Sequence, residues 1–230
     1  MMTDQQLESL IDSLNNNTAG ELIFLTPLSS LVEYGKVWAM KPCLRLDSYH
    51  PQKIYCIKNG AGVYVAVVLD ADNNLYWLVS KQYRRQGHLP TALQEIILPH
   101  IFQYRKEQKI TINEQVLDEG CFIAASKIAV KAGFVKTAGD TEVSTYHVQH
   151  TGLPIDKNFK EPGNTVISKQ RIVALKKQIN FISQSLLLVQ TEIEIKRGVS
   201  KYSEKLKELC NDIYKNMDRL DNVCCNKNSE

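Results

Sequence analysis

A short stretch near the middle of the chain combines basic residues, a glycine and the start of a helix. The apolar segment Leu75–Ser80 predicts a strand, Lys81–Gln86 predicts a polar loop, and helical periodicity begins at Pro90. Such a loop presents several backbone N–H groups to one point, with the positive end of a helix dipole behind them. The stretch therefore indicates a site for phosphate or pyrophosphate, without the Lys-Ser/Thr pair of an ATP-binding P-loop.

A second regular segment follows further along the chain. Phe122–Ala132 predicts a helix, and the pair Gly133-Phe134 would end the helix and begin a strand. By itself this segment predicts only an amphipathic helix with a glycine stop. One predicted helix and one predicted strand separate it from the basic loop, so the two segments keep a defined order in the fold.

Together the two segments resemble the GNAT superfamily of N-acetyltransferases, over residues 54–148. The loop Arg84–Leu89 is similar to that superfamily's pattern Gln/Arg-x-x-Gly-x-Gly/Ala, preceded by a strand that ends in Val79. Ser126–Phe134 is similar to the serine-to-Gly-Phe segment of the ribosomal-protein-type N-acetyltransferases. The resemblance implies acetyl-CoA as the acyl donor and requires no metal.

The resemblance also implies which residues hold the cofactor. Leu78 and Val79 would contact it at the end of the strand, and Val79 would give main-chain hydrogen bonds to the pantetheine arm and the thioester carbonyl. Ser126 would border the same arm. The residues that would wrap the pyrophosphate are Arg84, Arg85, Gln86, Gly87, His88 and Leu89. Leu89 stands where the family pattern has a small residue, so its side chain must point away from the phosphates.

Acetyl transfer needs a base for the amine and a proton donor for the leaving thiolate. Many superfamily members use a tyrosine four residues before the glycine of the Gly-Phe pair, but here Ala129 holds that place. Ile123 stands where asparagine is common. Ser126 and Tyr146 are the remaining candidate donors, and a packed strand aromatic is the alternative role of Tyr146.

The candidate base is Glu114. The predicted strand Leu75–Ser80 carries no carboxylate, whereas Glu114 lies on the strand before the second motif. Its placement is similar to that of a strand glutamate used by some N-terminal acetyltransferases. The alternative is a solvated glutamate at the edge of a sheet, and the sequence leaves both open.

Residues 1–150 predict one mixed α/β domain. From residue 54 to 148 the predicted order is strand, strand, strand, helix, strand, helix, strand, strand. The resemblance implies a GNAT-like, mostly antiparallel sheet flanked by helices. Thr3 or Asp4 predicts the cap of a first helix, and we expect another helix over Pro27–Lys36.

The C-terminal third predicts a helical hairpin. Residues 151–164, with two prolines and two glycines, predict a linker, and 165–230 predict two helices interrupted at Gly198. Apolar residues recur in strict heptad register at Ile172, Leu175, Ile179, Ile182, Leu186, Val189 and Ile193. This stripe predicts a coiled coil and favours a homodimer through these helices.

Composition narrows the class of protein. Hydrophobic residues at 43% and charged residues at 23% argue against a disordered or fibrous chain. The net charge of +3 and the lack of a reading motif make nucleic-acid binding an unfavoured interpretation. We expect no membrane span, no signal peptide, no metal site and a cytoplasmic location with reduced cysteines.

The sequence thus favours an acetyl-CoA-dependent N-acyltransferase acting on a primary amine of a protein or small molecule. The alternative is a catalytically degenerate, CoA-binding domain that serves assembly through its C-terminal helices. Ala129, Ile123 and Leu89 favour the alternative, whereas the stretches Val79–Gly87 and Ser126–Phe134 oppose it. The acceptor amine stays unidentified.

Overall fold

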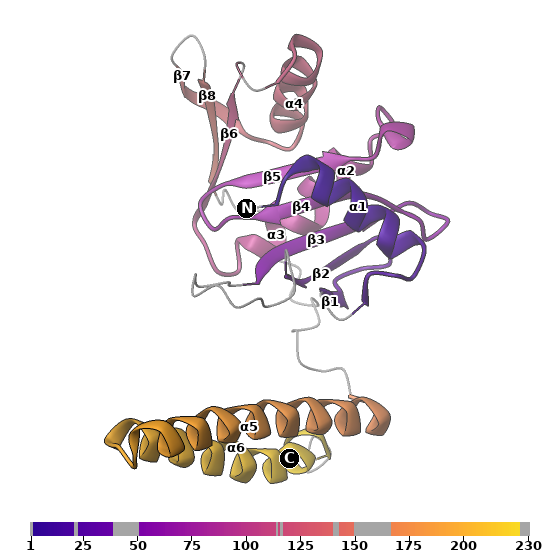
Figure 1. Cartoon of the computed structure of the whole chain (residues 1–230). Coiled ribbons are helices and arrows are strands. Elements are labelled where there is room, and N and C mark those ends of the chain that lie inside the picture. Colours follow the sequence, from indigo (N-terminus) through magenta and orange to yellow (C-terminus); the bar gives the residue numbers. More distant parts are fainter. Residues whose placement is uncertain are drawn as a thin grey trace. The chain divides into compact units, whose positions relative to one another are not determined.

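The computed structural model in Figure 1 describes residues 2–20, 23–38, 51–113, 115, 117–139, 143–149 and 167–225. The chain divides into two compact units, Met1–Pro162 and Gly163–Glu230. The first unit contains strands and helices, and the second contains two long helices.

Two antiparallel sheets build the first unit. The larger has the order β1-β2-β3-β4-β5 and the smaller the order β6-β8-β7. The strands are β1 Ile23–Pro27, β2 Val32–Val37, β3 Gln52–Lys58, β4 Tyr64–Asp70, β5 Leu75–Val79, β6 Glu107–Asn113, β7 Val135–Gly139 and β8 Val143–Gln149. The predicted mixed α/β class with mostly antiparallel strands is confirmed.

Helices cover both faces of the larger sheet. They are α1 Asp4–Asn15, α2 His88–Ala92, η3 Leu93–Ile97 and α3 Leu98–Ile101. Neighbouring residues of β3 point to opposite faces. Ile54 packs with Leu7 and Ile11 of α1, and Tyr55 packs in the cluster that contains Leu93 and Ile97. Two apolar cores therefore sandwich the sheet, and in Figure 1 α1 crosses the larger sheet.

The first helix begins where its sequence predicts. Thr3 caps α1, with its hydroxyl accepting from the backbone N–H of Gln6 while the Gln6 side chain accepts from the Thr3 N–H. This capping box satisfies two N–H groups that a helix start otherwise leaves unpaired.

The helix expected over Pro27–Lys36 is wrong, because the segment begins at the end of β1 and its second half belongs to strand β2. The Ser29 hydroxyl accepts hydrogen bonds from the N–H groups of Leu31 and Val32 and holds a tight turn. Strand β2 then pairs with both β1 and β3. Pairing with β3, which is distant in sequence, decides the conformation over local preference.

Helical backbone is continuous from His88 to Ile101, although Pro99 lies inside it. Proline has no N–H, and its ring clashes with the carbonyl four residues earlier in an α-helix. A π-helical turn, Leu93–Ile97, precedes the proline, and the Leu98 N–H bonds to the Leu93 carbonyl. The predicted distortion at Pro99 therefore takes the form of a π turn.

The second unit is a hairpin of α5, Lys169–Arg197, and α6, Lys201–Cys225. Its buried described residues are Ile172, Ser183, Gln190, Ser203 and Cys210. The predicted seam positions Ile182 and Val189 are instead exposed, and their neighbours Ser183 and Gln190 are buried in their place. The seam thus differs from the predicted one by about one residue, because the small side chains of Ser183 and Cys210 permit close packing.

Helix α5 is also apolar over much of its length. Among the described residues it is the one helix long and apolar enough to cross a membrane, with a mean hydropathy of 1.2 over 18 residues. Only 11% of that window is buried. This finding differs from the expected lack of a span, although buried helices of other proteins pass the same test of length and composition.

Candidate functional site

The two sheets of the first unit join at one point. Within the described part of the chain a single parallel bridge joins them, between Asn74, the residue before β5, and Lys109 of β6. The Asn74 side chain also accepts from the Thr111 N–H at 2.9 Å. Beyond this bridge the two strands form no ladder, and Figure 1 shows the smaller sheet turning away from β5. Strands β5 and β6 are therefore close together at Asn74 and diverge towards Val79. We call this divergence of the two strands the splay.

The open side of β5 offers main-chain groups. The Ser80 N–H donates to the Val65 carbonyl at 2.9 Å, and hydrogen bonds to β4 recur at every second residue of an antiparallel ladder. The peptide groups of Leu78 therefore face β4, whereas those of Trp77 and Val79 face the splay. The Val79 carbonyl accepts from Arg84 Nε at 3.2 Å.

The predicted cofactor residues Leu78 and Val79 lie on opposite faces of the sheet. The Leu78 side chain packs against the α1 core, and the Val79 side chain packs against the core under α2 and α3. Only Val79 of the pair has both its main chain at the splay and its side chain on the α2 face.

The loop after β5 bends sharply before α2. Arg85 has a φ of +64° and Gly87 a φ of +81°. A left-handed backbone suits glycine but is strained at arginine. Gly87 caps α2 without any side-chain hydrogen bond. The first N–H groups of the helix therefore have no side-chain cap, and such groups can bind an anion.

The loop side chains divide into exposed polar groups and a buried anchor. Arg84, Arg85 and Gln86 are exposed, and the Gln86 amide bridges the Gln82 carbonyl and the His88 ring. Leu89 is only 2% exposed and lies in the core. Its side chain points away from the loop surface, as an open phosphate site requires.

Helix α4, Glu119–Lys131, lies beside this loop. Asp118 caps the helix, and its carboxylate accepts from the Cys121 N–H at 2.8 Å. Hydrogen bonds from the N–H and the thiol of Cys121 lower the pKa of Asp118, and the Arg84 guanidinium lowers it further. Arg84 therefore lies close to the start of α4, and also at the end of β5.

Ser126 carries a buried and unpartnered hydroxyl. Its Oγ is shielded from solvent and forms no hydrogen bond with the described residues. Leaving such a group unsatisfied costs about 1–3 kcal/mol. A buried hydroxyl on α4 without a partner is therefore suited to hydrogen-bond a bound molecule.

Three other predicted positions have clear surroundings. Ala129 is fully buried in the core, so a larger side chain has no room there, whereas Ile123 is 43% exposed. Tyr146 is 5% exposed and packs in the same core from β8. Glu114 follows the last residue of β6, Asn113, and lies outside the described residues. The roles predicted for Glu114 and Tyr146 stay predictions.

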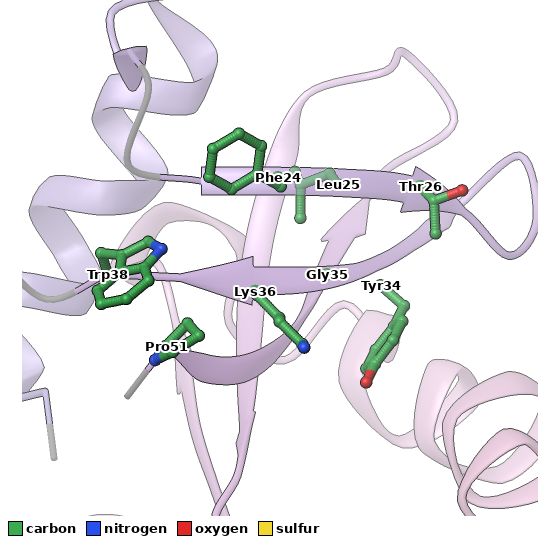
Figure 2. Close-up of a pocket in the computed structure, with 8 residues that line it drawn as sticks. All are labelled: Phe24, Leu25, Thr26, Tyr34, Gly35, Lys36, Trp38 and Pro51. Carbon is green, nitrogen blue, oxygen red and sulfur yellow. The ribbon is translucent and has the colours of Figure 1, made fainter. Parts of the chain in front are cut away.

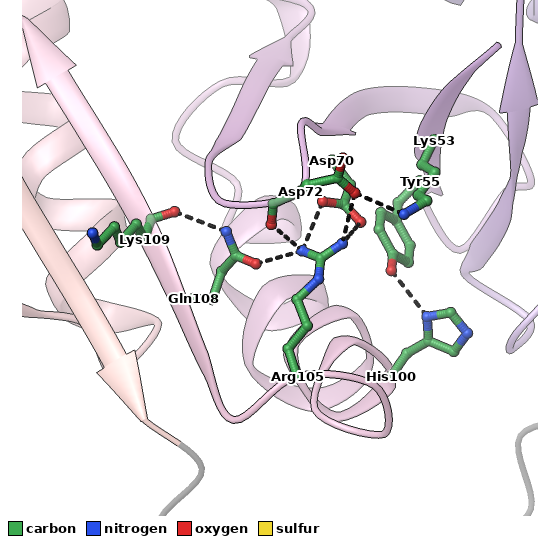
Figure 3. A network of polar contacts seen from close by, with 8 residues as sticks. All are labelled: Lys53, Tyr55, Asp70, Asp72, His100, Arg105, Gln108 and Lys109. Atoms are coloured by element: carbon green, nitrogen blue, oxygen red, sulfur yellow. Dashed lines mark hydrogen bonds and ion pairs between the residues drawn. The ribbon is translucent and has the colours of Figure 1, made fainter. Parts of the chain in front are cut away.

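A polar network at the closed end of the splay was missed by sequence analysis (Figure 3). Arg105 donates to both carboxylate oxygens of Asp70, at 2.8 and 2.6 Å, to the Asp72 carbonyl, and to Gln108 Oε1 at 2.7 Å. The Gln108 amide then donates to the carbonyl of Lys109, the bridge residue. No local pattern in the sequence predicts this network, because Asp70–Asn74 predicts only a turn.

An aromatic group lies beside this network. Tyr55 Oη and His100 Nδ1 are 2.9 Å apart, and the rings of Tyr34 and Tyr104 lie against His100. Burial raises the pKa of Tyr34 and lowers that of His100. Both shifts keep these groups neutral, so the cluster is a structural one.

A cavity of about 430 Å³ lies at the other edge of the larger sheet (Figure 2). It is lined by Phe24, Leu25, Thr26, Tyr34, Gly35, Lys36, Trp38 and Pro51. A Cβ on Gly35 would lie 1.8 Å from the Phe24 carbonyl oxygen, so only glycine permits this approach of β1. Because β1 and β5 are opposite edges, the cavity is separate from the splay.

No family model and no curated protein match the chain. Among the solved structures that are similar to it are two chimeras of spermidine N-acetyltransferase SpeG from Vibrio cholerae and hSSAT. The first covers 43% of this chain and 69% of its own, with 8% identity and a TM-score of 0.33. The second covers 62% and 90%, with 8% identity and a TM-score of 0.37.

The described residues contain no group of three His, Cys, Asp or Glu side chains placed to hold a metal ion.

Proposed function

We propose that this protein transfers the acetyl group of acetyl-CoA to a primary amine of a protein or small molecule, as the resemblance to the GNAT superfamily implies. One observation carries the proposal. The open strand edge at Trp77 and Val79 runs directly into a basic loop and an uncapped helix start at Gly87. An extended chain with a pyrophosphate at one end fits such a combination.

The fit follows the chemistry of each group. Pantetheine is an extended arm with amide groups, which can pair with the main chain of Val79 as an added strand does. The backbone N–H groups of His88 and Leu89, with Arg84 and Arg85, supply positive potential for the pyrophosphate. The Ser126 hydroxyl is the buried donor that the arm or the thiol would satisfy.

Two steps of the reaction need protein groups. The amine must lose a proton, and Glu114 is our proposed base because it follows β6, the strand on the other side of the splay. The departing thiolate must be stabilised, and we assign the donor role to Ser126, with Tyr146 as the second candidate. Acetyl-CoA would supply the activated acyl group.

One observation favours a second candidate function. Ala129 is fully buried, so the described part of α4 has neither the family's tyrosine nor room for it. A domain that binds CoA without turnover, and serves assembly through its helices, would tolerate this change. For either function we also propose a homodimer formed by the C-terminal helices.

Calorimetry with acetyl-CoA, followed by mass spectrometry of mixed primary amines, tests the proposal. Binding together with an acetylated amine and free CoA supports the enzyme. Binding without product, across polyamines, aminoglycosides and peptide N-termini, would favour the assembly function. Absence of binding at millimolar acetyl-CoA would refute both, while leaving the fold unchanged.

A further inference from the structure

The register of the first three strands places a row of side chains on one face of the larger sheet. Phe24 of β1 is opposite Lys36 of β2, and Lys36 is opposite Lys53 of β3. Residues that are directly opposite in an antiparallel sheet lie on the same face. Tyr34, two residues before Lys36, shares this face and packs against the core under α2 and α3. The row therefore lies beside that core, at the β1 edge of the sheet.

Part of this row lines the cavity of about 430 Å³ (Figure 2). Phe24, Tyr34 and Trp38 give the cavity three aromatic side chains, and Pro51 adds an apolar ring. Phe24 is 50% exposed and Trp38 is half-buried, so aromatic surface is open to a bound molecule. Small-molecule sites commonly measure about 300–1,000 Å³ and have mostly apolar linings. A planar ring suits such walls, because aromatic groups stack on one another.

One positive charge of the row is not balanced by the described residues. Lys53 Nζ is 2.8 Å from the Asp72 carboxylate, and the guanidinium of Arg105 is paired with Asp70. Lys36 is exposed and forms no hydrogen bond or ion pair with any described residue. Like charges directly opposite one another destabilise a sheet. A single negative charge bound at Lys36 would offset this repulsion.

Two more polar groups border the cavity and form no hydrogen bond with the described residues. They are the hydroxyl of Tyr34 and the indole N–H of Trp38. Both can donate a hydrogen bond, and the ammonium of Lys36 can donate three. In Figure 2 the side chains of Lys36 and Tyr34 extend from the same side of β2. The cavity thus combines aromatic walls with hydrogen-bond donors and one positive charge.

Paired strands hold the walls of the cavity in place. β1 and β2 form a continuous ladder from Ile23 to Pro27, and glycine at position 35 permits the close approach of the Phe24 carbonyl. A site that is ordered before binding loses less entropy when the ligand arrives. The cavity and the splay lie at opposite edges of the larger sheet, so a ligand here would be distinct from acetyl-CoA.

We propose that this cavity binds a small carboxylate that carries an aromatic ring. The ring lies against Phe24 and Trp38, and the carboxylate lies on the Lys36 ammonium. A carboxylate suits the site because it carries one negative charge and only accepts hydrogen bonds. A phosphate monoester carries about two charges, and the second would have no cation to balance it. An added peptide strand would bind chiefly through the main chain of β1 and would not need the charge of Lys36.

Calorimetric titration of the full chain with 3-phenylpropionate tests this site. We expect 3-phenylpropionamide, which has the ring without the charge, to bind about tenfold more weakly. Propionate, which has the charge without the ring, should also bind more weakly. Lys36→Met should remove the preference for the carboxylate over the amide. Lys131→Met makes the same change at an exposed lysine of α4 and should keep the preference.

Tryptophan fluorescence then locates the bound molecule. The chain has two tryptophans, so Trp77→Phe leaves Trp38 as the reporter. Binding of 3-phenylpropionate should change the emission of this variant, and Trp38→Leu should weaken binding while circular dichroism shows a folded protein. Absence of binding at millimolar 3-phenylpropionate would overturn the proposal. Equal affinities for the carboxylate and the amide, an unchanged Trp38 emission, or competition by acetyl-CoA would each overturn it as well.

Discussion

Arg105 and Asp70 form a two-point ion pair that ties the end of β4 to the segment leading into β6. The Asp70 side chain is 3% exposed and that of Arg105 is 21% exposed, so solvent screens the pair little. Through Gln108 the same guanidinium is linked to Lys109, where the two sheets meet. The pair therefore holds the closed end of the splay.

Replacing Arg105 should destabilise the first unit strongly. Lysine cannot reproduce the two-point contact, and removing one partner leaves the other charge buried. We expect Arg105→Lys or Asp70→Asn to lower the free energy of unfolding by about 3 kcal/mol. Lys53→Met removes the more exposed contact to Asp72 and should cost under about 1 kcal/mol. Denaturant titration measures all three, and equal losses would contradict this role of Arg105.

The loop before α2 should determine cofactor affinity. Acetyl-CoA that binds only the folded state raises the melting temperature by mass action. Arg84→Glu and Gly87→Asp each place negative charge where the pyrophosphate would lie, so both should abolish this rise. Lys136→Glu, on β7, makes the same charge change as Arg84→Glu elsewhere and should keep it. An undiminished rise in the loop variants would exclude this loop as the phosphate site.

Replacing Ser126 should affect stability and function differently. Because its buried hydroxyl bonds none of the described residues, Ser126→Ala should leave the free protein as stable or slightly more stable. Turnover, or acetyl-CoA affinity, should fall if the hydroxyl bonds the ligand. Ser144→Ala, buried on β8, serves as a comparison. A variant that loses stability and keeps full affinity would show that Ser126 has only a structural role.

Glu114→Gln tests the proposed base. Loss of a positioned general base costs about 100-fold in turnover, while the amide keeps the size of the side chain. Acetyl-CoA binding should be unchanged, because Glu114 follows β6 and is not part of the proposed pyrophosphate loop Arg84–Leu89. Glu107→Gln, at the other end of β6, is the matched control. If both variants turn over at the normal rate, deprotonation does not depend on Glu114.

Local patterns predicted the parts of the fold whose causes are local. The strand Leu75–Ser80, the following loop and the helix after it appear at the predicted places, and Thr3 caps the first helix. Gly133 ends α4, with a φ of +96° that favours glycine. In each case the deciding contacts lie within a few residues of one another.

Features that depend on distant contacts could not be predicted from one sequence. Strand β2 depends on pairing with β3, and Arg105 meets Asp70 across 35 residues of chain. The hairpin seam shows the same limit. Ile182 fits the heptad as well as any residue, but close packing of Ser183 with Cys210 determines which side of α5 is buried.

The final prediction concerns pH and the buried ring of His100. Burial lowers the pKa of His100 from its usual 6.5, an effect that Asp70 partly offsets, and Tyr55 lies within hydrogen-bond distance of Nδ1. The unfolded chain therefore takes up a proton at a higher pH than the folded one does. Stability due to the neutral ring is present above about pH 6.5 and is lost as the pH falls through the folded pKa.

The slope of stability against pH is the decisive measurement. Where only the unfolded state is protonated, the free energy of unfolding should fall by up to about 1.4 kcal/mol per pH unit on acidification. His100→Gln should lower stability at neutral pH, because it disturbs the packing with Tyr34 and Tyr55, but it should flatten this slope. His147→Gln, half-buried on β8, should leave the slope in place. Identical slopes for the wild type and His100→Gln would show that another group drives the acid sensitivity.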